Sequence, residues 1–197
     1  MDSDAVLVAL LAAGRATRFG GGKLDAPCAG KPVGCWVVEA VEAAGLAPGV
    51  CVTGPAAPRF LAGAVGWSRI VNRQPEEGLG GSLAVAARAA QARNSAAMLV
   101  VLADMPLVTP LLLGRLVSGG RAAATDHGGG RPGVPALIPR ALFSRLAGAR
   151  GDQGAAKLLA GLAGLALVAP AAQELLDIDT PADLARAEAL LMRRLQG

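Results

Sequence analysis

Short apolar runs alternate with longer helix-like segments along this chain, and this alternation constrains its fold more than any other feature. Short runs without charge are typical of strands that are buried on both faces of a sheet. They predict strands at 5–11, 50–53, 69–71, 98–102, 121–125, 134–138 and 165–168. The segments between them predict helices at 32–44, 82–93, 110–117, 139–146, 154–162 and 181–195.

The residues at the expected helix boundaries agree with this division. Pro32 opens the first helix and Gly45 follows its end, while Thr109 and Thr180 each precede a proline, as an N-cap does. Strands joined through helices need right-handed crossovers, which favour parallel pairing. We therefore expect an α/β fold, with three α/β/α layers and a mostly parallel, Rossmann-like central sheet. No repeat or long linker divides the chain, so one domain is expected over 1–197.

Composition and charge exclude several other classes of protein. The net charge is only +4 and the basic residues are scattered, so the basic stripe of a nucleic-acid-binding protein is not expected. The acidic start, Met1 to Asp4, does not resemble a secretory signal, and the apolar run 5–13 is too short to cross a bilayer. The three cysteines and His127 lack the spacing of a metal site, which indicates free thiols in a reducing cytoplasm.

The loop after the first predicted strand combines glycines with positive charge. It runs from Leu11 to Lys23, and its small residues let a ligand approach backbone N–H groups closely. Arg18 offers a planar fork of donors and Lys23 a movable point charge, a combination that suits a triphosphate. The glycine spacing fits neither a Walker A loop nor a dinucleotide loop. From the residues alone, a flexible loop with surface charges is the alternative.

Aspartates follow two further segments whose ends should meet this loop. Asp104 comes directly after the strand 98–102, where a carboxylate is placed to hold magnesium. Asp177 and Asp179 flank Ile178 before the last helix, and only one of the two is expected to face Asp104. The alternatives are that Asp104 caps the next turn and that Asp179 interacts only with the helix dipole.

The sequence Leu-Ala-Ala-Gly-x-x-x-Arg-x-Gly, followed by Lys23, resembles the signature loop of the MobA-like NTP transferase family, which has a GT-A-like nucleotidyltransferase fold. It is most similar to the molybdenum cofactor cytidylyltransferase branch. The resemblance implies that the loop wraps the nucleotide, with Arg18 and Lys23 on the phosphates. The residues it assigns to nucleotide binding are Leu11, Ala12, Ala13, Gly14, Arg18, Lys23, Ser82 and Asp104. The form Ala12-Ala13-Gly14 implies CTP over GTP.

Three later segments extend the resemblance. Residues 102–107 are similar to the family's central metal motif and 177–184 to its C-terminal motif, which implies Mg²⁺ held by Asp104 and Asp179, with Asp177 in reserve. Residues 77–83 resemble the segment near the base, and 151–155 a turn common in the cytidylyl branch. The branch usually has Gly-His-Pro where this chain has Val134 between its glycine and proline, and His127, seven residues away, is not expected to replace that histidine.

Together these motifs imply an enzyme that transfers CMP from CTP to a phosphorylated small molecule, with release of pyrophosphate. The implied acceptor is molybdopterin or molybdenum cofactor, and contact with a molybdoenzyme or its chaperone would follow. Arg18, Lys23 and Asp104 are the expected catalytic residues. An acceptor phosphate is already ionised, so no general base is needed. The alternatives are transfer from GTP or to a sugar phosphate, and a nucleotide-binding regulatory or assembly protein without turnover.

Overall fold

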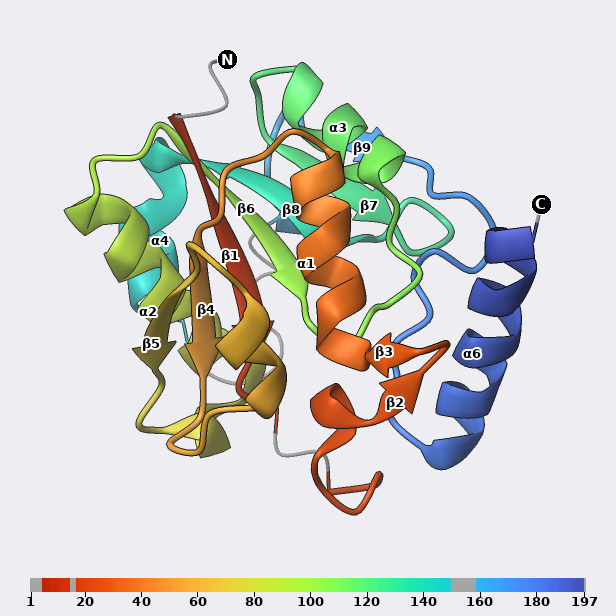
Figure 1. The fold of residues 1–197 in the computed structure, drawn as a ribbon. Helices are drawn as coiled ribbons and strands as arrows, with labels where there is room; N and C mark the ends of the chain where they lie inside the picture. The colour runs from red at the N-terminus through yellow and green to blue at the C-terminus, as the bar shows by residue number, and fades with distance from the viewer. Residues whose placement is uncertain (1–4, 15–16, 150–158, 197) are drawn as a thin grey trace.

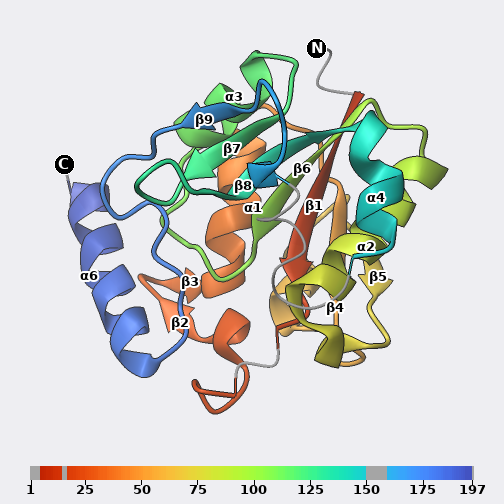
Figure 2. The ribbon, with the colours of Figure 1, turned by 180° about the vertical axis from the view of Figure 1, so that it is seen from behind.

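The computed structural model of this protein describes residues 5–14, 17–149 and 159–196. Within these ranges a seven-stranded sheet lies between two layers of helices, as the two views in Figures 1 and 2 show. Its strands are β1 (Val6–Ala12), β4 (Val50–Thr53), β5 (Ser68–Val71), β6 (Ala97–Leu102), β7 (Ala123–Asp126), β8 (Pro132–Pro139) and β9 (Ala166–Val168).

The strands are ordered β5-β4-β1-β6-β8-β7-β9. All neighbouring pairs are parallel except those made by β8, which is antiparallel to both β6 and β7. The mostly parallel, Rossmann-like sheet expected from the sequence is therefore confirmed. Because the parallel strands share one direction, the loops after β1, β5, β6 and β7 meet at the same edge of the sheet.

Each face of the sheet has its own apolar core. Along β1, Val8 and Leu10 pack in one cluster with α1 (Val33–Ala43) and α3 (Pro110–Ser118). Leu7 and Leu11 pack in the other with α2 (Gly78–Ala92) and α4 (Phe143–Ala147). Successive side chains of a strand point to opposite faces, so an uninterrupted apolar strand is what a sheet covered on both sides requires.

A third, smaller cluster joins two distant parts of the chain. It contains Cys28 and Val33 from the region of the short hairpin β2 (Pro27–Cys28) and β3 (Lys31–Pro32). It also contains Ile178 and Leu191, from the region of α6 (Pro181–Gln196). Figure 1 shows α6 beside this hairpin, away from the main sheet. This packing holds the loop after β1 against the segment that precedes α6.

The helix starts differ from the prediction in two places. Helix α2 begins at Gly78, four residues before the expected Ser82, and a short 3-10 turn at Pro75–Glu77 leads into it. Glycines are poor helix formers, so the glycine-rich first turn of α2 is not predicted as helix from the sequence. The helix expected at 139–146 is divided into a 3-10 turn, Arg140–Leu142, and α4. Most of the helix expected at 154–162 lies outside the described residues.

No helix in the described ranges is long and apolar enough to cross a membrane. All three cysteines are free thiols, and Cys28 and Cys51 are buried. Burial raises the pKa of Cys28 to about 11 and that of Cys51 to about 12.

Candidate active site

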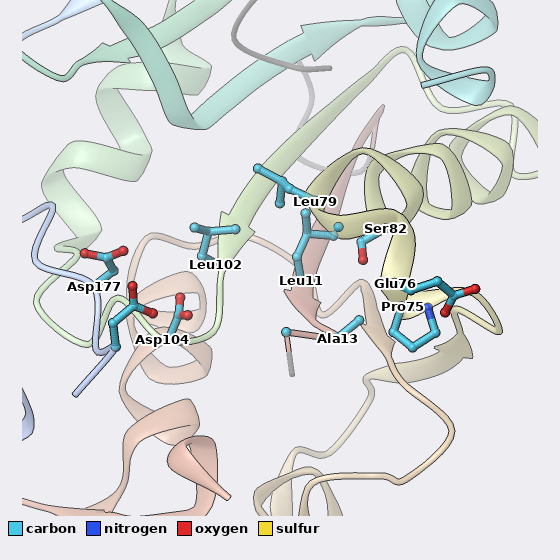
Figure 3. Close-up of a pocket in the computed structure, with 12 residues that line it drawn as sticks. Leu11, Ala13, Pro75, Glu76, Leu79, Ser82, Leu102, Asp104 and Asp177 are labelled. Atoms are coloured by element: carbon cyan, nitrogen blue, oxygen red, sulfur yellow. The ribbon is translucent and has the colours of Figure 1, made fainter. Parts of the chain in front are cut away.

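A cavity of about 590 Å³ opens at the edge of the sheet where the parallel strands end. Figure 3 shows that Asp104 and Asp177 lie at one end of this cavity, whereas Pro75, Glu76 and Ser82 lie at the other. Between them are the ends of β1 and β6. The residues lining the cavity are Leu11, Ala13, Gly14, Pro75, Glu76, Gly78, Leu79, Ser82, Leu102, Asp104, Asp177 and Asp179.

The loop after β1 forms one wall of this cavity. Leu11, Ala13 and Gly14 line it, and Ala12 lines a neighbouring cavity of about 240 Å³ together with Gly14 and Lys23. The run Gly20 to Gly22 has positive φ at all three residues, between 65° and 98°, a conformation that side chains other than glycine's rarely adopt. This left-handed run turns the chain back, so that Lys23 comes next to the cavity.

Lys23 is almost completely buried and makes three polar contacts. Its Nζ lies 2.6 Å from Asp104 Oδ2 and 3.2 Å from Asp179 Oδ1, and it donates to the carbonyl oxygen of Ile178 at 2.6 Å. Because Asp104 Oδ2 and Asp179 Oδ1 both contact this one nitrogen, the two oxygens cannot be further apart than these two Nζ–oxygen distances added together. Burial lowers the pKa of Lys23, but the Asp104 and Asp179 carboxylates outweigh it, and the net shift is upward.

Asp104 is fixed by the backbone on both sides of its strand. The N–H of Ala103 donates to the carbonyl of Leu11 at 3.0 Å, and the N–H of Ile178 donates to the carbonyl of Asp104 at 2.9 Å. One carboxylate oxygen, Oδ2, binds Lys23, whereas Oδ1 is buried and has no hydrogen-bond partner among the described residues. A buried carboxylate oxygen without a partner is costly in the absence of a cation.

The segment before α6 brings Asp177 and Asp179 to the same cavity. Thr180 and Asp183 cap the helix reciprocally: the Asp183 N–H donates to Thr180 Oγ1 at 3.2 Å, and the Thr180 N–H to Asp183 Oδ2 at 2.8 Å. The exposed Arg18 lies 3.4 Å from Asp179 Oδ2.

Asp177 does not bind Lys23 but lines the cavity beside Asp104 and Asp179. The expectation that only one of these two aspartates faces Asp104 is therefore wrong, and residues two positions apart on an extended chain do point to the same side. Burial, together with the Asp104 and Asp179 carboxylates, raises the pKa of Asp177.

The donor set fits a hard divalent cation. Within the described ranges no three histidine, cysteine or acidic side chains are grouped as a complete protein cage for a metal. Magnesium is usually bound by one or two carboxylates, with phosphate oxygens and water as its other ligands. The paired oxygens of Asp104 and Asp179, and the unpartnered Oδ1 of Asp104, match that pattern.

Two further contacts involve residues without a predicted role in the site. Asn72, directly after β5, donates from Nδ2 to Ser82 Oγ at 3.2 Å, and both residues are buried. His127, at the end of β7, lies with Nε2 2.8 Å from the carbonyl oxygen of Val134. The imidazole thus reaches the segment where the family motif would have placed a histidine, although it is seven residues away in sequence. The motif at 151–155 lies outside the described residues.

Comparison with known proteins identifies the family. The sequence profile of the MobA-like NTP transferase domain matches residues 8–169. The chain belongs to this family. Among curated proteins, it is 30% identical over 200 residues to the purine catabolism protein PucB of Bacillus subtilis (strain 168), with 92% of this chain and 95% of PucB covered.

Several solved structures share the fold of this chain. Rv0371c from Mycobacterium tuberculosis H37Rv is 28% identical and superposes with a TM-score of 0.77 over 93% of this chain and 97% of its own. A structure of Rv0371c in complex with manganese matches at 26% identity and a TM-score of 0.72, covering 93% and 98%. A nucleotidyl transferase from Methanothermobacter thermautotroptrophicus, 23% identical, shares the fold with a TM-score of 0.81 over 96% of this chain and 98% of its own.

The MobA-like family match covers the loop after β1, Ser82 and Asp104, but it ends at residue 169. Asp177 and Asp179 lie beyond it, and the fold brings them to the same cavity as Asp104. The protein is thus a MobA-like nucleotidyltransferase whose cavity is built from both the profile-matched region and the segment that follows it.

Proposed function

We propose that this MobA-like protein transfers the CMP group of CTP to a phosphorylated acceptor, molybdopterin or molybdenum cofactor, with release of pyrophosphate. The observation that carries the proposal is the position of Lys23, buried between Asp104 and Asp179 beside the glycine-rich loop. Phosphate-binding cations and metal-binding carboxylates are both needed for nucleotidyl transfer, and here Lys23 contacts the two carboxylates that line one end of the cavity.

Phosphoryl chemistry of this kind needs charge and alignment more than covalent help. An oxygen of the acceptor phosphate forms a bond to the α-phosphorus of CTP, and the bond from that phosphorus to the bridging oxygen of pyrophosphate breaks. Lys23 and Arg18 stabilise the negative charge that develops on the phosphates. Asp104 and Asp179 would hold a divalent cation, Mg²⁺ in our proposal, which would neutralise phosphate charge when bound. The structure of Rv0371c in complex with manganese supports the proposal of a divalent metal.

The choice of CTP rests on Ala12-Ala13-Gly14, and the choice of acceptor on the resemblance of the four motifs to the cytidylyltransferase branch. The same motifs favour turnover over a purely regulatory role, because a protein that only binds a nucleotide does not need a lysine and two carboxylates around one cation position. Val134, in place of the family histidine, makes the acceptor the first part of the proposal to test.

The deciding experiment is a pyrophosphate-release assay with CTP, GTP, ATP and UTP, each with Mg²⁺ and with molybdopterin or a sugar phosphate. We expect release with CTP and molybdopterin only. Release with GTP and molybdopterin would contradict the choice of nucleotide. Release with a sugar phosphate would contradict the acceptor. Tight CTP binding without any release would favour the regulatory alternative.

A further inference from the structure

The side chain of Asn72 is held in one orientation at the wall of the cavity. Asn72 is 3% exposed, and its backbone N–H donates to the carbonyl of Thr53 at 2.7 Å. Its Oδ1 accepts from the N–H of Gln74 at 2.9 Å. A backbone N–H can only donate, so the atom that faces it must be the carbonyl oxygen of the amide. The amide nitrogen therefore faces the other way, toward Ser82 Oγ at 3.2 Å.

This contact decides what Ser82 can offer a ligand. A serine hydroxyl has one proton to donate and two lone pairs that accept. Because Ser82 Oγ accepts from Asn72, its own proton is free to donate elsewhere. The described part of the chain contains no acceptor bonded to that proton, neither a side chain nor the carbonyl that helical serines often use. Ser82 is 5% exposed and lines the cavity, so its donor is available to a bound molecule.

The surroundings of Ser82 indicate what kind of group it meets. Apolar side chains line the cavity near it, among them Leu11, Leu79 and Pro75, whereas the aspartates lie at the opposite end (Figure 3). A nucleotide whose phosphates lie at the aspartate end would place its base between these apolar side chains. A flat ring fits such walls, and a ring carbonyl or ring nitrogen accepts from a single hydroxyl donor.

We infer that Asn72 is a positioning residue that directs the Ser82 proton into the cavity, where it is donated to an acceptor atom of the nucleotide base. The inference rests on the proposed function, since it requires a nucleotide in this cavity. Helix α2 carries glycine at position 81, where a Cβ would lie 2.9 Å from Glu77 Cβ, which is too close, and 3.4 Å from the Asn72 amide nitrogen, which is an ordinary contact.

The test reverses the direction of the hydrogen bond. In Asn72→Asp the side-chain shape is kept and an oxygen still accepts from Gln74, but the carboxylate now accepts from Ser82 and turns its proton away from the cavity. We expect the Kd for CTP with Mg²⁺, measured by calorimetry, to rise about tenfold, as for Ser82→Ala. To control for the added negative charge, Asn72→Asp is also made in the S82A background. There the rise in the Kd for CTP should be clearly smaller, because no serine proton remains to be redirected. Asn72→Ala in the same cycle is a second variant without charge.

Each outcome bears on the inference. The inference is supported if Asn72→Asp or Asn72→Ala weakens CTP binding when Ser82 is present but not in the S82A background. Equal weakening in both backgrounds overturns it while the CTP proposal stands, because the wild-type protein still binds CTP. If the protein binds another NTP and not CTP, and the Asn72 variants raise the Kd for that NTP only when Ser82 is present, the inference is supported and the proposed nucleotide is contradicted. If the wild-type protein binds no NTP at all, both are overturned.

Discussion

Lys23 Nζ lies 2.6 Å from Asp104 Oδ2, and this ion pair joins the loop after β1 to the end of β6. The same ammonium group contacts Asp179, so it occupies the space between the two carboxylates proposed as metal ligands. A cation that binds both carboxylates directly must move the ammonium aside. The negatively charged phosphates of a nucleotide would attract the displaced lysine, which couples metal binding to nucleotide binding.

Lys23→Met should therefore strengthen metal binding in the absence of nucleotide. The methionine has a similar length without the charge that competes for the carboxylates. Two unit charges about 4 Å apart repel by several kcal/mol at the effective dielectric of a protein surface, so a gain of at least about tenfold in Mn²⁺ affinity is expected. Calorimetry or Mn²⁺ electron paramagnetic resonance measures it. Lys31→Met is the matched control, because Lys31 lies over the Trp36 ring outside the cavity. Unchanged Mn²⁺ affinity would show that Lys23 does not compete.

Lys23→Ala should slow turnover more than it weakens nucleotide binding. A charge-assisted contact to phosphate contributes about 1.5–3 kcal/mol in a site of this kind. We expect kcat/KM to fall about tenfold to a hundredfold, mostly through kcat. Steady-state pyrophosphate release against Lys31→Ala measures the effect. A value equal to that of the control would mean that Lys23 only stabilises the fold.

Asp104→Asn and Asp179→Asn should each abolish most of the activity. If the two carboxylates hold one cation, the double variant should be scarcely worse than either single variant, because groups that act as a unit are not additive. Asp126→Asn, at the end of β7, supplies a matched change outside the cavity. Additive losses in a double-mutant cycle would argue that the aspartates act independently.

The three cysteines should react with iodoacetamide at different rates. The thiolate is the reactive form, and burial raises the pKa of Cys28 to about 11 and of Cys51 to about 12, whereas Cys35 is partly exposed. At pH 8 we expect Cys35 to be labelled first. A raised pKa in the folded state also means that stability is lost as pH rises from about 9 toward these values. Peptide mass spectrometry and thermal unfolding between pH 8 and 11 test both expectations; native labelling of Cys51 as fast as that of Cys35 would contradict them.

Several parts of this site could be predicted because short sequence signals mark them. Uninterrupted apolar runs predicted the buried strands, and the end of β6 placed Asp104 at the ligand-binding edge. Glycines and a lysine after β1 predicted the position of Lys23 near that edge. Thr180, which precedes a proline, predicted the start of α6 as an N-cap.

Other features depend on packing between residues that carry no local signal. Asn72 is a single polar residue after a short edge strand, and only the fold brings it to Ser82. His127 is seven residues from Val134 in sequence, so the sequence does not predict a contact between them. Strands β7 and β8 are antiparallel neighbours, however, and this pairing places His127 beside the Val134 carbonyl. The sequence does not predict the early start of α2, because glycine lowers helix propensity. Gly81 is nevertheless required there, since a Cβ at this position would lie too close to Glu77.

The small apolar cluster between the hairpin and the α6 region affects how the site is completed during synthesis. Lys23 and Asp104 emerge from the ribosome with the first four parallel strands, whereas Asp179 follows β9. A nascent chain arrested after β9 would already contain every strand of the sheet but lack Ile178, Ala187 and Leu191, which pack against Cys28 and Val33. In such a chain the Lys23 ammonium would have only Asp104 as a carboxylate partner. The second carboxylate arrives only once this cluster closes, so the order of translation would delay the formation of the proposed cation site until every strand of the sheet has been made.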